Sequence, residues 1–136
     1  MLREALRRRA IAVPESPAHR LESARRPDLR LLELLRELSG GLRLPDARGR
    51  RERRCERILA EMLERDFPQR HARPSDATDL RALSLALPNC QLVTCDAFMA
   101  ELIARARLDV RFGCELFSGR RRDVDRLRRR LEELLN

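Results

Sequence analysis

The sequence has no lysine, tryptophan or tyrosine, and it has no long apolar segment. Its aromatic content is 3%, all of it phenylalanine, so aliphatic side chains must form the core. No stretch of about eighteen apolar residues occurs, which excludes a membrane-spanning helix. The basic start, MLREALRRRAIAV, lacks the apolar region of a secretion signal. We therefore expect a cytoplasmic protein that does not associate with a membrane.

Cysteine and histidine do not occur at the spacings that bind zinc. The four cysteines include no CxxC pair, and neither histidine lies at ligand spacing from them. His19 and His71 lie in proline-containing segments, which favours a surface position over a catalytic one. We expect free thiols and no disulfide framework.

All thirty basic residues are arginine, and the formal net charge is +8. A guanidinium group offers a planar set of donors that suits phosphate, so this excess indicates a nucleic-acid or other polyanionic partner. The alternative is that a GC-rich genome replaces lysine by arginine throughout, which would carry no functional meaning. Composition alone leaves both explanations open.

A length of 136 residues fits one domain, and the apolar spacing predicts a mainly helical first half and an alternating second half. The expected elements are a strand at Ala10–Val13, helices at Asp28–Leu38 and 50–64, a loop at 66–75, a helix from Asp76 or Thr78 to Leu87, a strand at Cys90–Thr94, a helix at Ala97–Arg107, a strand at Asp109–Cys114 and a helix at Arg121–Leu135. Alternating helices and strands predict an α/β fold with a parallel sheet.

Three aspartates are expected near one edge of this sheet. Asp96 follows the strand that ends at Thr94, and Asp76 and Asp79 share one side of the first turn of the preceding helix. Carboxylates that converge repel one another, and Mg²⁺ or Mn²⁺ offsets that repulsion. The alternative is that all three cap helices or interact with helix dipoles, and spacing alone favours this alternative.

The stretch SDATDLRALSLALPNCQLVTCDAFMAELI, residues 75–103, resembles the second half of a PIN-domain ribonuclease. In that family an aspartate opens a helix, a strand ending in Val-Thr follows, and an Asp or Asn comes shortly after this pair. The corresponding residues are Asp79, the pair Val93 and Thr94, and Asp96. The segment ALPNC also resembles the ALPYC-type turn of one bacterial branch.

This resemblance implies a PIN-like three-layer α/β/α fold and metal-dependent hydrolysis of single-stranded RNA. Asp79 and Asp96 would hold Mg²⁺ or Mn²⁺, Asp76 would be an auxiliary catalytic and metal-binding residue, and Thr94 would orient a carboxylate or a water. A bacterial toxin with an antitoxin protein as partner is one form of this function. The alternative is a degenerate PIN-like module that binds RNA or a protein without cutting.

The first half of the sequence departs from the PIN pattern. The family begins with an apolar strand that ends in an aspartate, and no such segment precedes Pro14. Glu15 is the nearest acidic residue, and Glu52 and Glu56 are the candidates for the glutamate on an early helix. We therefore expect a single PIN-like domain over 1–136 that is divergent over 1–74, keeps its α/β core half at 75–136 and is incomplete at the N-terminus.

Two further surfaces are candidates for contacts with partners. Arg120, Arg121 and Arg122 belong to the densest basic cluster and are candidates for contacts with nucleic acid, although a solvated charged helix face is an equally good explanation. The amphipathic helices expected at 50–64 and 121–135 are candidate surfaces for a homodimer.

Overall fold

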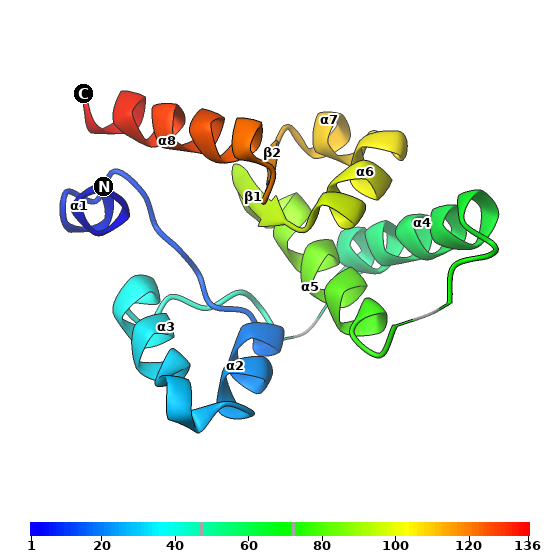
Figure 1. Ribbon diagram of the computed structural model, residues 1–136, viewed down its shortest axis with the longest axis horizontal. Helices are drawn as coiled ribbons and strands as arrows, with labels where there is room; N and C mark the ends of the chain where they lie inside the picture. Colours follow the sequence, from blue (N-terminus) through cyan, green and yellow to red (C-terminus); the bar gives the residue numbers. More distant parts are fainter. Residues whose placement is uncertain (47, 72) are drawn as a thin grey trace. The chain divides into compact units, whose positions relative to one another are not determined.

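The computed structural model describes residues 1–46, 48–71 and 73–136 (Figure 1). The chain forms two compact units. One comprises residues 47–120 and is called the central unit below; the other combines Met1–Asp46 with Arg121–Asn136 and is called the terminal unit. The protein is mixed α/β and mostly helical, with one short parallel sheet. No helix in the described ranges is long and apolar enough to cross a membrane.

The central unit contains four helices and the two strands of the sheet, within the residues described. In chain order they are α4 (Arg50–Asp66), α5 (Asp76–Asn89), β1 (Leu92–Cys95), α6 (Ala97–Arg105), α7 (Leu108–Phe112) and β2 (Glu115–Ser118). Figure 1 shows α4 and α5 packed side by side. In the sequence, α6 and α7 lie between β1 and β2.

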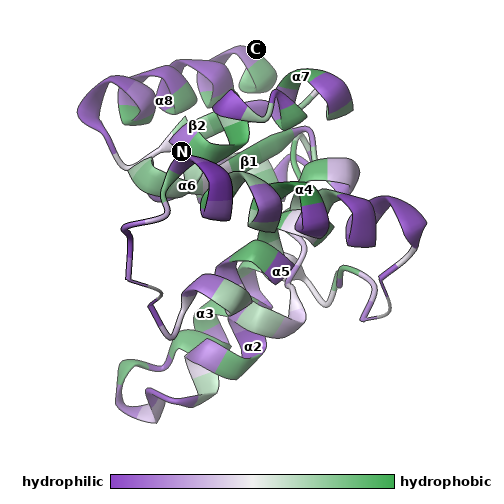
Figure 2. Ribbon diagram, turned by 90° about the vertical axis from the view of Figure 1, so that its right-hand side faces the viewer, coloured by the Kyte–Doolittle hydropathy of each residue, from purple (hydrophilic) through white to green (hydrophobic). Residues whose placement is uncertain are grey.

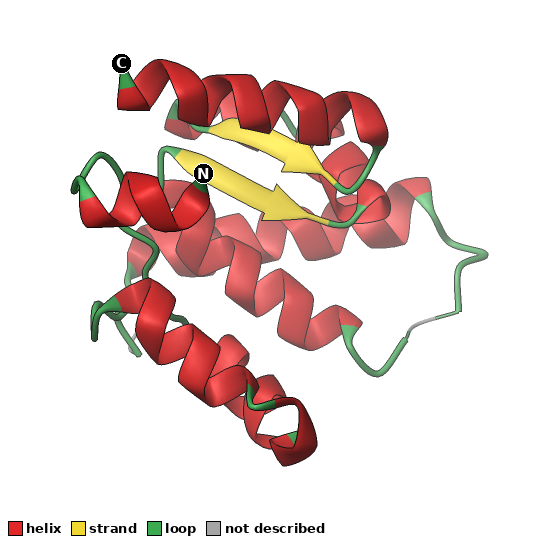
Figure 3. Ribbon diagram, turned by 60° about the vertical axis from the view of Figure 1, so that its left-hand side comes forward, coloured by secondary structure: helices red, strands yellow, loops and turns green. Residues whose placement is uncertain are grey.

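The strands β1 and β2 are parallel, as the alternation of elements predicts. Val93 pairs with Leu116 and Thr94 with Phe117, and Figure 3 shows both arrows pointing the same way. The Glu115 N–H donates a hydrogen bond of 2.7 Å to the carbonyl of Gln91, which fixes the start of the pairing. Parallel strands need a crossover connection, which α6 and α7 provide.

The hydrophobic core of the central unit is formed mainly by aliphatic side chains from each of its helices and from β1. Its buried members are Cys55 and Leu59 of α4, Leu80, Leu83 and Leu87 of α5, Val93 of β1, Met99, Leu102 and Ile103 of α6, Leu108 of α7, and Cys114. The spacing of Cys55 and Leu59 places both on one face of α4, so this long charged helix packs by that face only. This confirms the sequence-based expectation for that helix.

The strand expected at Asp109–Cys114 is wrong, because this segment is the short helix α7 followed by a turn. The alternation of Val110, Phe112 and Cys114 suggested a strand, yet Val110 is 64% exposed. Leu108 and Phe112 lie one helical turn apart and pack on the core instead. Gly113 ends the helix with a φ of 65°, a left-handed conformation that glycine adopts without strain, and β2 begins two residues later.

The boundary between α5 and β1 also lies beyond the expected position. Helix α5 continues through Pro88 to Asn89, and β1 starts at Leu92 and not at Cys90. Pro88 has no N–H to donate within the helix, but the two residues that follow it donate to carbonyls of the last turn. The Cys90 N–H donates to the carbonyl of Ala86 at 2.8 Å, and the Asn89 side chain donates to the carbonyl of Leu85 at 2.7 Å.

The terminal unit is helical throughout its regular elements, within the residues described. They are α1 (Leu2–Arg7), α2 (Pro17–Ala24), the 3₁₀ turn η1 (Pro27–Leu29), α3 (Leu31–Ser39) and α8 (Arg121–Leu135). Gly40 caps the C-terminal end of α3 with a φ of 57°, a left-handed conformation that favours glycine. Helices α2 and α3 pack against each other.

The strand expected at Ala10–Val13 is wrong. The extended contact instead lies two residues later, where Glu15 and Arg43 form an isolated parallel bridge. The Glu15 N–H donates to the carbonyl of Leu42, and the Leu44 N–H donates to the carbonyl of Glu15, both at 2.9 Å. Pro14 has no N–H to donate, which keeps residues before Glu15 from extending the pairing.

We predict that Leu59→Ala destabilises the central unit by about 2–5 kcal/mol, because Leu59 is 0% exposed and its loss leaves a cavity between packed elements. Urea denaturation followed by circular dichroism measures this change. Val110→Ala is the matched control, since Val110 is exposed, and a change within about 0.5 kcal/mol is expected. Equal effects of the two substitutions would contradict this description of the core.

Candidate functional site

The candidate site residues lie at the start of α5 and around the end of β1. Asp76 and Asp79 lie in the first turn of α5, Thr94 lies in β1, and Asp96 directly follows β1 as the N-cap of α6. Thr94 is exposed, whereas its neighbour Val93 is buried, as expected for alternate residues of a strand. Asp79 is half-buried, and its N–H donates to the carbonyl of Ser75 at 2.8 Å.

Asp76 is buried and makes an ion pair within the chain. Its side chain is paired with Arg70: one guanidinium nitrogen donates to Oδ2, and another donates to Oδ1 at 3.1 Å. The backbone N–H of Arg73 donates to Oδ2 at 2.9 Å. The hydrogen bonds from the Arg70 side chain are the main reason that the pKa of Asp76 lies below its ordinary value, and the Arg73 backbone donor adds to this effect.

The Arg70 guanidinium also lies over an aromatic ring. Its central carbon is 3.9 Å from the centroid of Phe98 in α6. Phe98 in turn contacts Phe67 edge to face, with centroids 5.0 Å apart. We call Arg70, Asp76 and Phe98 the Arg70 clamp. It ties the segment between α4 and α5 to both α5 and α6.

Asp96 is engaged by its own helix. One carboxylate oxygen accepts a hydrogen bond of 2.7 Å from the Met99 N–H, which makes Asp96 the side-chain cap of α6. The alternative that this residue caps a helix is therefore confirmed. Within residues 1–46, 48–71 and 73–136, the structure forms no group of three or more His, Cys, Asp or Glu side chains able to hold a metal ion. Asp76, Asp79 and Asp96 are thus not brought together as one ligand set.

In this arrangement Asp76 does not fit the role of a metal ligand. Three donors already occupy its two oxygens, and a guanidinium supplies the positive charge that a cation would otherwise provide. Asp96 keeps one oxygen outside its capping bond and is exposed.

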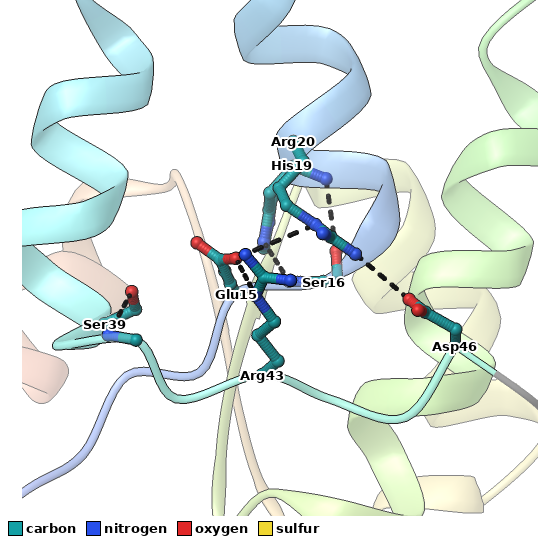
Figure 4. A network of polar contacts seen from close by, with 8 residues as sticks. Glu15, Ser16, His19, Arg20, Ser39, Arg43 and Asp46 are labelled. Carbon is teal, nitrogen blue, oxygen red and sulfur yellow. Dashed lines mark hydrogen bonds and ion pairs between the residues drawn. The ribbon is translucent and has the colours of Figure 1, made fainter.

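Glu15, which the sequence suggested only as the acidic residue nearest the first strand-like segment, is buried in a second network of arginines. It is 4% exposed, and its Oε1 lies 2.8 Å from Nε of Arg43 and 3.7 Å from Nε of Arg20 (Figure 4). Arg20 also contacts Asp46 at 3.0 Å. The carboxylate of Glu15 is therefore neutralised inside the terminal unit, just as Asp76 is neutralised inside the central unit.

The next residue fixes the start of α2. The hydroxyl of Ser16 accepts a hydrogen bond from the His19 N–H, and the Ser16 N–H donates to Nδ1 of His19. The two residues form a reciprocal cap at this helix end, shown beside Glu15 in Figure 4. His19 thus has a structural role.

The glutamates of α4 make local contacts. Hydrogen bonds from backbone N–H groups, first its own and also that of Gly49, lower the pKa of Glu52. The side chain of Asn89 donates to Oε1 of Glu52 at 3.3 Å. Glu56 forms an ion pair with Arg48.

The three arginines predicted to contact nucleic acid are exposed. Arg120 is the last residue of the central unit, and Arg121 and Arg122 begin α8 of the terminal unit. The backbone N–H of Arg120 donates to the hydroxyl of Ser118 at 3.3 Å. Their exposure agrees with both a binding role and a solvated helix face.

All four cysteines are free thiols, as expected. Burial is the main reason that the pKa of Cys55 is raised to about 12, and it also raises the pKa values of Cys90 and Cys114. A raised pKa favours the protonated thiol, which is a weaker nucleophile than the thiolate.

Comparison of the chain with protein-family models, with curated proteins and with solved structures finds no match in any of the three. The functional argument therefore depends on the residues and contacts described above.

We predict that Asp76→Asn lowers the free energy of unfolding at neutral pH and that the loss shrinks in acid. The folded-state pKa of Asp76 is lowered, so its stabilisation is complete above the unfolded value of about 3.9 and disappears as pH falls through the folded value. Urea denaturation of both proteins from neutral pH down to about pH 3 measures the difference. Parallel pH profiles would show that the carboxylate charge does not stabilise the fold.

Proposed function

We propose that this protein is a PIN-like module that binds single-stranded RNA without hydrolysing it. The observation that carries the proposal is the Arg70 clamp, in which the most buried of the three candidate aspartates is already paired with a cation of the chain itself. Asp96, the second candidate, uses one oxygen to cap α6. Residues committed in this way favour a binding role over a metal-dependent reaction.

The charge of the protein supports a polyanionic partner. The buried carboxylates of Glu15 and Asp76 are paired with arginines inside the protein. The excess positive charge, formally +8, therefore lies on other arginines, many of which are exposed. Guanidinium groups bind phosphate with two parallel hydrogen bonds, which lysine does not do. The resemblance over residues 75–103 indicates RNA in single-stranded form as the polyanion.

The aromatic side chains favour contacts with phosphates over stacking on bases. Phe67 and Phe98 contact each other, Phe112 lies under Arg51, and Phe117 is 1% exposed. None of the four phenylalanines in the described chain is an exposed platform. Binding that depends on phosphate contacts is sensitive to salt and nearly independent of base sequence.

A second candidate function is the metal-dependent endoribonuclease, such as the toxin of a toxin–antitoxin pair. It is favoured by the positions of Asp76 and Asp79 at the start of α5 and of Asp96 directly after β1, which are the positions that the PIN resemblance implies. In this function Asp79 and Asp96 hold Mg²⁺ or Mn²⁺. Asp76 would join them only after Arg70 leaves its carboxylate.

We expect the protein to bind a short fluorescently labelled single-stranded RNA and to leave it uncleaved during incubation with Mn²⁺. Binding should weaken steeply with salt, because each phosphate contact adds about −0.7 to the slope of log affinity against log salt concentration. Fluorescence anisotropy measures the affinity, and denaturing gel electrophoresis measures the integrity of the RNA. Absence of binding at low salt would overturn the proposal.

Cleavage would instead establish the second candidate, provided that it depends on the predicted residues. Asp79→Asn and Asp96→Asn are the variants that test this, since each keeps the shape of the side chain and removes its charge. Cleavage that both substitutions abolish would make the protein a nuclease. Cleavage that neither changes would indicate a contaminating enzyme, and the wild-type preparation would then be repurified and measured again.

We also predict that calorimetric titration with Mn²⁺ gives no saturable heat for the wild type, because a guanidinium already neutralises Asp76. Arg70→Gln removes this internal cation, keeps a hydrogen-bond donor and leaves the carboxylate free to attract an ion. Weak Mn²⁺ binding in this variant alone would agree with the proposal. Tight binding by the wild type would contradict it and favour the nuclease.

A further inference from the structure

The first half of α4 carries four exposed arginines on one face. Arg50, Arg53, Arg54 and Arg57 follow the i, i+3, i+4, i+7 spacing of a single helix face, and each is exposed. We call these residues the α4 arginine stripe. At a rise of about 1.5 Å per residue, the stripe extends about 10 Å along the helix axis.

The opposite face of α4 keeps the stripe turned toward solvent. Cys55 and Leu59 are 1% and 0% exposed, and both belong to the hydrophobic core of the central unit. Rotation of the helix would expose these side chains and bury arginines. The position of the stripe is therefore fixed by the packing of the fold, and Figure 2 shows most of α4 coloured as hydrophilic.

The acidic residues nearest the stripe are engaged elsewhere. Glu52 contacts Asn89 and backbone N–H groups, and Glu56 pairs with Arg48. Only the last member of the stripe has a carboxylate close by among the described residues, because Arg57 lies 4.0 Å from Glu61. The first three members form no ion pair within the part of the chain that the structure describes, and Arg53 donates to the backbone carbonyl of Arg48.

Not every arginine of this helix is available in this way. Arg51 lies with its guanidinium carbon 5.5 Å from the centroid of the Phe112 ring and donates to the carbonyl of Pro88. It therefore holds α4 against its neighbours. The stripe members contact no aromatic ring in the described residues.

This arrangement opposes the stability of the isolated helix. Arginines in the first turns oppose the positive end of the helix dipole, and the pairs Arg50/Arg54 and Arg53/Arg57 repel each other at i, i+4 spacing. Helix α8 is different, since ion pairs within it link Arg126 to Asp123, Arg128 to Glu132 and Arg130 to Glu133. Charge repulsion of the kind seen in α4 is relieved by a bound polyanion.

We propose that the α4 arginine stripe is the surface that binds the sugar–phosphate backbone of RNA. This inference rests on the proposed RNA-binding function and adds the location of the site. A row of guanidinium groups about 10 Å long fits successive phosphates of an extended strand better than one small anion. The stripe contacts phosphates, so it positions the strand without reading its bases.

The experiment compares the wild type with the double variant Arg50→Gln/Arg54→Gln in RNA titrations at several salt concentrations. We expect the affinity to fall about tenfold at low salt and the salt slope to become shallower by about 1.4, because two phosphate contacts are lost. Arg36→Gln/Arg81→Gln is the matched control. It removes the same charge from exposed residues outside α4, and wild-type affinity within about twofold is expected.

The thermal unfolding of each apoprotein separates a binding defect from a folding defect. Removing repulsion from the start of α4 should leave the midpoint of the stripe variant unchanged or slightly raised. A binding loss in a protein as stable as the wild type supports the inference. If the stripe variant is less stable, Arg54→Gln alone is measured, and its salt slope should be shallower by about 0.7.

Further outcomes identify which statement fails. If the wild type binds no RNA, the proposed function fails together with the site. If the wild type binds and the stripe variant binds equally well, only the site is wrong, and loss of affinity in Arg121→Gln/Arg122→Gln would move the site to the start of α8. Tighter stripe-dependent binding to phosphatidylserine vesicles than to RNA at the same salt would replace RNA by a membrane surface and overturn the inference.

Discussion

The pairing of a buried carboxylate with arginine is the constraint on which the rest of this structure depends. An ionised carboxylate inside a protein is costly unless a cation and hydrogen bonds compensate for the lost water. Asp76 meets this requirement through Arg70 and the Arg73 backbone, and Glu15 meets it through Arg43 and Arg20. Arg70 is thereby attached to the start of α5, and Arg43 is attached through Glu15 to the segment that precedes α2.

This constraint also determines which arginines are free to carry the excess positive charge on the surface. Arginines that compensate buried carboxylates, or that stack on Phe98 and Phe112, are used by the fold itself. In the α4 arginine stripe, which is exposed, Arg57 has an acidic neighbour in Glu61, whereas Arg50, Arg53 and Arg54 form no ion pair within the described residues. A GC-rich genome would explain arginine in place of lysine, but it would not explain why Glu52 and Glu56 contact Asn89 and Arg48 and not the exposed stripe. Local conflict of this kind is characteristic of surfaces selected for a partner.

The sequence predicted α3, α4, α5, α6 and α8 because their apolar residues repeat at helical spacing, as Cys55 and Leu59 do in α4. It also predicted a parallel pair of strands from the order of the elements. It did not predict α2, which begins at a proline. It failed at α7, where Val110, Phe112 and Cys114 alternate as in a strand, but Leu108 and Phe112 pack as in a helix. It also missed Arg70, because a contact between Arg70 and Asp76 across a proline-containing loop leaves no periodic signal. The capping role of Asp96 was weighed from the sequence, whereas the burial of Glu15 depends on pairing with Arg43, far along the chain.

The two candidate functions make opposite demands on Arg70. As an internal cation it stabilises the start of α5 through three donors on Asp76, counting the Arg73 N–H, and through its contact with Phe98. A metal ion bound by Asp76 would have to replace the guanidinium contribution and also compensate for a partly buried arginine left without its partner. The freed guanidinium would then lie close to the metal, where like charges repel. Recruiting Asp76 to a metal site therefore requires the protein to give up the interaction between Arg70 and Asp76, whereas binding RNA through exposed arginines leaves that interaction intact.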